Sequence, residues 1–124
     1  MKIVVSSTSN DLAGQLDPRF GRCAYLIIVD SETMQFEAIP NAAANSGGGA
    51  GIQTAQLIAD KGAKVVITGN VGPNAFRALS AAGIEIITGA VGIIQEVVEK
   101  FKQGEYNRTG APTVAEHFGS KQGQ

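Results

Sequence analysis

Asp17-Pro18-Arg19-Phe20-Gly21-Arg22-Cys23 leads directly into Ala24-Tyr25-Leu26-Ile27-Ile28-Val29-Asp30, so an irregular loop turns into an apolar strand. Residues 34–40 are also strand-like, and only Ser31-Glu32-Thr33 separates the two segments, which predicts an antiparallel hairpin. The loop holds two arginines, a glycine and the only cysteine of the chain. Function concentrates in loops that a rigid scaffold positions, so residues 17–23 are the first candidate for a site. The alternative is a surface loop with solvated arginines and a structural cysteine.

Three other segments are short apolar runs of the kind that a sheet buries on both faces, namely residues 2–6, 64–68 and 84–88. Apolar residues recur at helical spacing over residues 52–59, from Pro73 to just before Gly83, and over residues 92–103. This alternation predicts parallel strands joined by right-handed crossovers, with the hairpin added beside the first strand. We therefore expect a single α/β domain with a five-stranded mixed sheet in the order 3-2-1-4-5, an antiparallel second strand and three helices.

The composition of the 124 residues limits the partners of the protein. No apolar run approaches the roughly 20 residues that a membrane span needs, and Ile3-Val4-Val5 is too short for a signal peptide, so we expect a cytoplasmic protein without a membrane partner. Ten basic and eleven acidic residues nearly cancel, which argues against a nucleic-acid partner. A single cysteine excludes an intramolecular disulfide and an all-cysteine metal cage within one chain.

Glycine-rich loops are expected to meet at one edge of this sheet, where the parallel strands end. The loops over residues 7–22, 41–51, 69–72 and 89–92 should gather there, beside the start of the second strand at Cys23. Three of these loops also precede helices, whose first N–H groups and partial positive charge attract anions. Taken singly, each glycine loop is better explained by a tight turn in a compact domain. Together with two arginines, they predict a site for an anion.

The predicted site combines these loops with the cysteine. A thiolate is a good soft ligand for iron, and arginine offers a fixed fork of donors to an oxyanion. We expect Cys23 to be the metal ligand. The expected binding residues are Arg19, Phe20, Gly21, Arg22, Gly48, Gly49, Gly51, Gly69, Asn70, Gly72 and Gly89.

Catalytic groups are missing from the expected site. The only histidine, His117, lies in the polar C-terminal region, and the predicted strands end in Thr68 and Thr88 rather than in carboxylates. The two-metal nuclease pattern would need several carboxylates facing one another. Residues 47–51 do not match the phosphate-loop motif, and no dinucleotide-binding glycine motif follows the first strand. We expect a protein that is not an enzyme.

Several motifs resemble those of a known family. They are Met1-Lys2-Ile3-Val4-Val5, Arg19-Phe20-Gly21-Arg22-Cys23 leading to Val29-Asp30, Gly51-Ile52-Gln53, Thr68-Gly69-Asn70-Val71-Gly72-Pro73-Asn74-Ala75, and Ala82-Gly83-Ile84. Over residues 1–104 the chain resembles the dinitrogenase iron–molybdenum cofactor biosynthesis family, with its NifX-like and NafY-like carriers and the C-terminal domain of the NifB protein. Residues 105–124 are expected to be a polar, flexible tail. Family carriers often have His-Phe-Gly where this chain has Arg19-Phe20-Gly21.

The resemblance implies a ribonuclease H-like fold and non-enzymatic binding of an iron–sulfur or iron–molybdenum-type cluster, or its precursor, during metallocofactor assembly. Cluster-assembly proteins are then the expected protein partners. Because one thiolate cannot complete the ligand set of a cluster, exogenous ligands or a second chain would supply the rest, and both a monomer and a homodimer are compatible with this. The alternative is a regulatory or adaptor module that binds a small oxyanion or a partner protein at the same edge, without metal.

Overall fold

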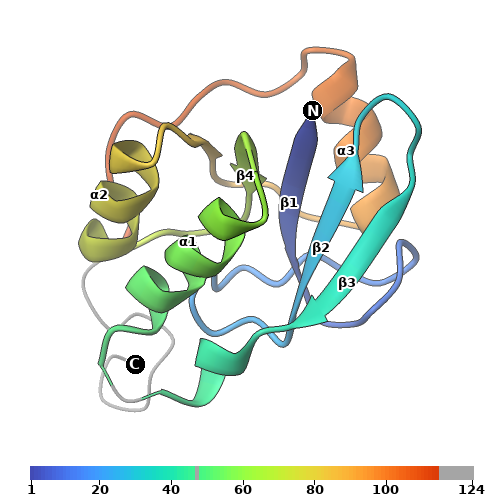
Figure 1. Cartoon of the computed structure of the whole chain (residues 1–124). Coiled ribbons are helices and arrows are strands. Elements are labelled where there is room, and N and C mark those ends of the chain that lie inside the picture. Colours follow the sequence, from blue (N-terminus) through green and yellow to red (C-terminus); the bar gives the residue numbers. More distant parts are fainter. Residues whose placement is uncertain (47, 115–124) are drawn as a thin grey trace.

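The computed structural model describes residues 1–46 and 48–114, so Gly47 and His117 lie outside the described residues. Five strands form one sheet in the order β3-β2-β1-β4-β5, as predicted (Figure 1). The strands are β1 (Lys2–Ser7), β2 (Tyr25–Asp30), β3 (Phe36–Pro40), β4 (Val65–Ile67) and β5 (Glu85–Ile87). β2 runs antiparallel to both of its neighbours, whereas β1, β4 and β5 are parallel. The predicted sheet order and strand directions are confirmed.

Three helices cover the two faces of the sheet. The helices α1 (Ala50–Asp60) and α2 (Pro73–Ala81) lie on one face, and α3 (Ile94–Lys102) lies on the other (Figure 1). The central strand β1 explains this layering, because successive side chains of a strand point to opposite faces. Val4 packs into the cluster under α1 and α2, whereas Ile3 and Val5 pack into the cluster under α3. The continuous apolar runs of the sequence are therefore strands with two buried faces.

The strand pairing places the expected loops at one edge. The end of β1 pairs with the start of β2, as Ser7 lies opposite Tyr25, and β4 and β5 run parallel to β1. The loops that follow β1, β4 and β5 therefore leave the sheet at the same edge, where β2 begins. The turn between β2 and β3 lies at the opposite edge, because Lys2 is paired with Asp30.

Local details, mainly at the ends of elements, differ from the sequence prediction. The strand expected from Met34 begins at Phe36, because Met34 belongs to the hairpin turn and has a positive φ of 62°. The helix expected from Gly92 begins at Ile94, and Ile93, which was expected on the apolar stripe, is its partly exposed N-cap. A short 3-10 helix, η1 (Ala42–Asn45), was not predicted. The first two differences occur at element ends, where local hydrogen bonds compete with apolar periodicity.

The first ten residues after residue 104 contact other parts of the chain. Residues 105–114 run from the end of α3 toward the side of the molecule where α2 lies (Figure 1). Tyr106 packs against the cluster under α3, and Thr109 and Thr113 bond to the backbone of other segments. Residues 105–114 thus make hydrogen bonds and apolar contacts with the rest of the chain, whereas the flexibility expected of residues 105–124 stays a prediction, and residues 115–124 lie outside the described part of the chain.

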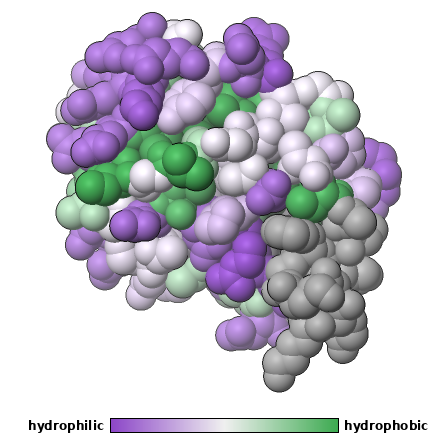
Figure 2. Space-filling view, turned by 180° about the vertical axis from the view of Figure 1, so that it is seen from behind, coloured by the Kyte–Doolittle hydropathy of each residue, from purple (hydrophilic) through white to green (hydrophobic). Residues whose placement is uncertain are grey.

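The surface mixes polar and apolar areas. Seen from behind, several separate apolar patches interrupt a largely polar face (Figure 2). The large apolar side chains that are exposed are those of Met1, Phe36, Val91 and Ile93. None of the helices within residues 1–46 and 48–114 has the length and apolar character that crossing a membrane requires.

Candidate functional site

A pocket opens at the loop edge of the sheet, on the side covered by α1 and α2. It has a volume of about 70 Å³. Four separate parts of the chain line it: residues 19–22, residues 49–52, residues 70–72 with 74 and 75, and Val114. The loop over residues 17–23, called the arginine loop below, therefore meets the glycine loops that precede α1 and α2, as predicted.

Two helix N-termini point into this pocket. α1 begins after Gly49, whose φ of 84° lies in the left-handed region, and α2 begins after Gly72 with Pro73 in its first turn. Neither N-cap residue has a side chain that could accept a hydrogen bond from the first turn. Within an α-helix the first N–H groups have no acceptor, and they carry the positive end of the helix dipole. The pocket therefore presents donors and partial positive charge.

Close packing of three backbone segments shapes the pocket floor. A Cβ atom on Gly21 would lie 2.8 Å from the backbone nitrogen of Gly51, and one on Gly51 would lie 2.9 Å from the Cβ of Ala75. Both distances are too short for real side chains. Glycine at these two positions allows the arginine loop to lie on α1 and allows α1 to lie on α2 at its N-terminal end.

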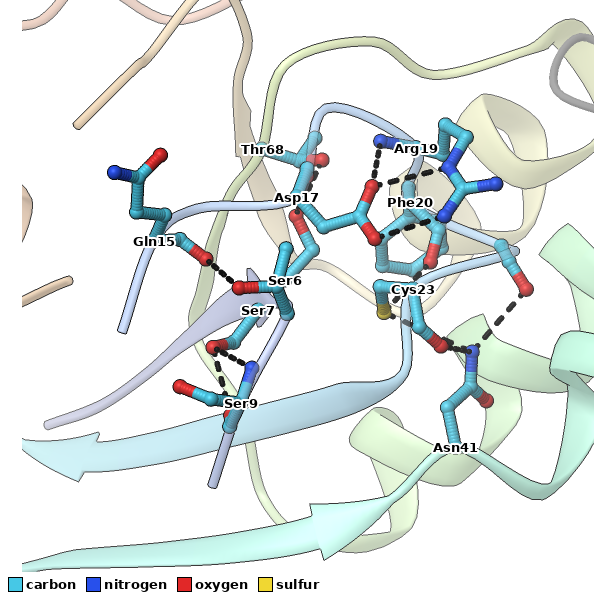
Figure 3. A network of polar contacts seen from close by, with 12 residues as sticks. Ser6, Ser7, Ser9, Gln15, Asp17, Arg19, Phe20, Cys23, Asn41 and Thr68 are labelled. Carbon is cyan, nitrogen blue, oxygen red and sulfur yellow. Dashed lines mark hydrogen bonds and ion pairs between the residues drawn. The ribbon is translucent and has the colours of Figure 1, made fainter. Parts of the chain in front are cut away.

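Arg19 is held at the pocket by a buried carboxylate that the sequence prediction did not include. Asp17 is 3% exposed and accepts hydrogen bonds from the Arg19 backbone N–H (2.9 Å), Nε (3.2 Å) and Nη2 (3.1 Å) (Figure 3). These hydrogen bonds raise the pKa of Arg19 above its ordinary value. In Figure 3 the third guanidinium nitrogen points away from Asp17. Arg19 is thus a fixed, partly neutralised cation with a donor that points away from Asp17.

Arg22 lines the pocket and also bonds to the segment that follows β3. Its Nη1 donates hydrogen bonds to the backbone oxygens of Ala44 (3.0 Å) and Ser46. These carbonyls belong to η1 and the residue that caps it, which precede the glycine loop before α1. The charge of Arg22 therefore lies beside the pocket while its side chain also organises the neighbouring loop.

Cys23 lies beneath the pocket rather than in it. Its side chain is completely buried in the cluster under α1 and α2, and it is absent from the pocket lining. Sγ donates to the Phe20 carbonyl (3.2 Å) and accepts from Asn41 Nδ2 (3.7 Å) (Figure 3). Burial and, secondarily, the negative charge of Asp17 raise the pKa of the Cys23 thiol to about 12. A thiol that stays protonated is a poor metal ligand, because metals bind the thiolate.

Three of the glycines that were predicted to bind the ligand lie outside the pocket. Gly69 is buried against Pro18, where a Cβ would lie 2.6 Å from the Pro18 Cα, so it serves the packing of two loops. Gly89 donates its N–H to the Gly69 oxygen (2.8 Å) but leads toward α3, and Gly48 is exposed before the N-cap of α1. None of these three lines the pocket.

Sequence reasoning missed Asp17 and Val114. Asp17 stands two residues before Arg19, a spacing at which aspartate commonly accepts a backbone N–H, so a local signal was present. Val114 lies in a stretch without periodicity, and only the folded chain brings it to the pocket. Among the described residues, no three His, Cys, Asp or Glu side chains are grouped so that they could hold a metal ion.

Comparison with known proteins gives one family. The family model described as dinitrogenase iron-molybdenum cofactor matches residues 1–104. An uncharacterized protein of Methanocaldococcus jannaschii is 32% identical over 111 residues, which cover 87% of this chain and 91% of that protein. The crystal structure of the apo form of the orange protein from Desulfovibrio gigas is 40% identical with a TM-score of 0.88, covering 90% of this chain and 95% of the other. An NMR structure of a NifB candidate from Thermotoga is 32% identical with a TM-score of 0.79, covering 90% and 96%. The chain belongs to the dinitrogenase iron–molybdenum cofactor family.

Proposed function

We propose that this protein is a cytoplasmic, non-enzymatic carrier that holds an anionic iron–sulfur or iron–molybdenum-type cluster, or its precursor, in the pocket between α1 and α2. The observation that carries the proposal is the convergence of two helix N-termini with the arginine loop on one cavity. Each helix terminus contributes about half a positive charge, and Arg19 and Arg22 border the same opening. Such a site favours an anion.

The donor set indicates how the cluster would be held. The lining residues offer backbone N–H groups and guanidinium groups, and neither a thiolate nor an imidazole is among them. A cluster whose metals already carry sulfide ligands would be bound by hydrogen bonds and charge rather than by protein–metal bonds. This revises the expected role of Cys23, which in this arrangement supports the loop from below and does not reach the cargo.

The size of the pocket suits a carrier. A pocket of about 70 Å³ would hold one side of a cluster and leave its remainder exposed. A partly exposed cargo can be passed to a cluster-assembly protein, which is the partner that the family membership supports. The structure of the D. gigas relative is described as the apo form of that protein.

Anaerobic reconstitution tests the proposal. The protein is incubated with ferrous iron, sulfide and molybdate, desalted, and analysed for metals, sulfide and visible absorbance. We expect the wild type to retain a metal–sulfur chromophore. Arg19→Gln should weaken uptake about tenfold, because one charge-assisted hydrogen bond is worth roughly 1.5–3 kcal/mol. Lys102→Gln on α3 removes one positive charge on the other face and is the matched control.

Two outcomes would redirect the proposal. Uptake that disappears in Cys23→Ala, with the fold intact by circular dichroism, would restore Cys23 as a cluster ligand. A wild type that retains no metal but binds inorganic phosphate in calorimetry would instead support the oxyanion-binding adaptor.

A further inference from the structure

The segment that follows α3, residues 105–114, forms a strap across the last strand of the sheet. Thr109 donates its N–H to the Ile86 oxygen (2.7 Å), and the Thr88 N–H donates to Thr109 Oγ1 (3.0 Å). Arg108 forms an ion pair with Glu85 at 3.0 Å. Since β5 is the edge strand of the sheet, these contacts occupy backbone groups that would otherwise remain unpaired at that edge.

The strap continues from β5 to the pocket. Thr113 uses its backbone N–H to bond to the Val71 oxygen (2.9 Å), and its Oγ1 accepts the Val71 N–H (2.9 Å). Both backbone groups of Val71 are therefore engaged by one residue. Val71 stands between Asn70 and Gly72, which line the pocket, and Gly72 is the N-cap of α2.

The next residue enters the pocket wall. Val114 is partly buried and is one of the lining residues. The other lining residues come from segments within residues 1–104, the range that the family model matches. The pocket of this chain is thus completed by a residue that lies outside the family's matched range.

We propose that Thr113 is a positioning residue for the loop between β4 and α2, and that Val114 determines how firmly the pocket retains its cargo. By holding Val71 on both sides, Thr113 sets where the N-terminus of α2 points. Val114 adds an apolar surface that keeps water from one side of the opening, and a drier site strengthens hydrogen bonds and charge interactions. The retention role rests on the proposed carrier function, whereas the positioning role does not.

The positioning role is tested by amide hydrogen exchange in the full-length protein without cargo. Thr113→Val keeps the shape of the side chain and removes the acceptor for the Val71 N–H, so Val71 should exchange about fivefold faster. Thr113→Ser keeps the hydroxyl and should restore slow exchange. Thr33→Val is the matched control, because Thr33 also accepts a backbone N–H but lies in the turn at the opposite edge. Unchanged exchange at Val71 in Thr113→Val would overturn this role.

The retention role is tested by the rate at which the anaerobically reconstituted iron–molybdenum–sulfide species is lost from the protein. Val114→Ser should release it several-fold faster than the wild type. Val91→Ser, which changes an exposed valine away from the pocket, should leave the rate unchanged. Equal rates for Val114→Ser and wild type would overturn the retention role. A wild type that never retains the species would overturn the carrier function together with this role, while exchange at Val71 would still decide the role of Thr113.

Discussion

At the scale of single residues, two buried side chains hold the arginine loop in place through hydrogen bonds. Asp17 holds the Arg19 guanidinium through two side-chain hydrogen bonds, and Cys23 donates to the carbonyl of Phe20 in the same loop. Both groups are almost completely shielded from water. Asp17 forms an ion pair with Arg19 at 3.1 Å, whereas burial and the nearby carboxylate raise the pKa of the Cys23 thiol. The loop thus presents positive charge outward because its negative partner lies inside.

The raised pKa of Cys23 predicts a specific loss of stability at high pH. The thiol has an ordinary pKa of 9.0 and a folded-state pKa of about 12. Below pH 9 both states are protonated and the stabilisation is complete. Between pH 9 and 12 only the unfolded chain loses the proton, so stability falls by up to roughly 1.4 kcal/mol per pH unit. From pH 8 to 10.5 the wild type should therefore lose about 2 kcal/mol more than Cys23→Ala.

Urea denaturation of both proteins at the two pH values measures this difference. All other side chains are the same in both proteins, so their contributions cancel in the comparison. Parallel stability curves for wild type and Cys23→Ala would show that the thiol ionises normally in the folded state. The thiol would then be available as a ligand after all.

At the scale of elements, the contact between α1 and α2 depends on a missing side chain. Gly51→Ala would place a Cβ 2.9 Å from the Ala75 Cβ, and neither atom belongs to a flexible side chain that could move aside. Alanine in a helix normally adds stability relative to glycine, by about 0.5–1 kcal/mol. We expect the opposite sign here, a loss of about 1–3 kcal/mol from overpacking.

A double-mutant cycle isolates this contact. Ala75→Gly removes the opposing methyl group, so Gly51→Ala should cost less or become stabilising in that background. Equilibrium unfolding of the two single variants, the double variant and the wild type gives the interaction energy. Additive effects would mean that the loss arises elsewhere than between Gly51 and Ala75.

The elements that the sequence predicts well are those with strong apolar patterns. The β-branched runs at residues 2–6, 64–68 and 84–88 indicate buried strands, and right-handed crossovers then leave few sheet orders. The predictions are less accurate where one hydrogen bond decides the structure. Met34 enters a turn because its N–H bonds to the Asp30 oxygen, and residues 105–114 are held by threonine hydroxyls that no spacing rule marks.

The same division applies to the candidate site. The sheet topology alone implies that the loops of this site meet. The pocket lined by residues 19–22, 49–52, 70–72, 74 and 75 could therefore be anticipated. The direction of a side chain in a loop depends on tertiary packing. The sequence pattern of the loop does not indicate that packing. Cys23 turns inward because Asn41 and the apolar cluster surround it, and Gly89 leaves the pocket because α3 lies on the far face.

At the scale of the whole molecule, one sheet joins two apolar clusters that have different relations to the pocket. The cluster under α1 and α2 lies directly below the pocket, whereas the cluster under α3 lies across the sheet. β1 contributes to both, through Val4 on one side and Ile3 and Val5 on the other. Because the central strand is shared, neither cluster can lose its packing without loosening the other.

This coupling predicts a single unfolding transition even when only one face is weakened. Leu79→Ala empties space under α2 and Ile94→Ala empties space under α3, and both side chains are completely buried. Each should lower the free energy of unfolding by about 2–5 kcal/mol, because buried Leu or Ile to Ala substitutions generally do. Circular dichroism of the helices and NMR signals from β1 should then report the same midpoint in each variant. Separate midpoints for the two probes in Ile94→Ala would show that the α3 face unfolds alone. The strand β1, which leads into the arginine loop, would then remain folded after α3 has unfolded.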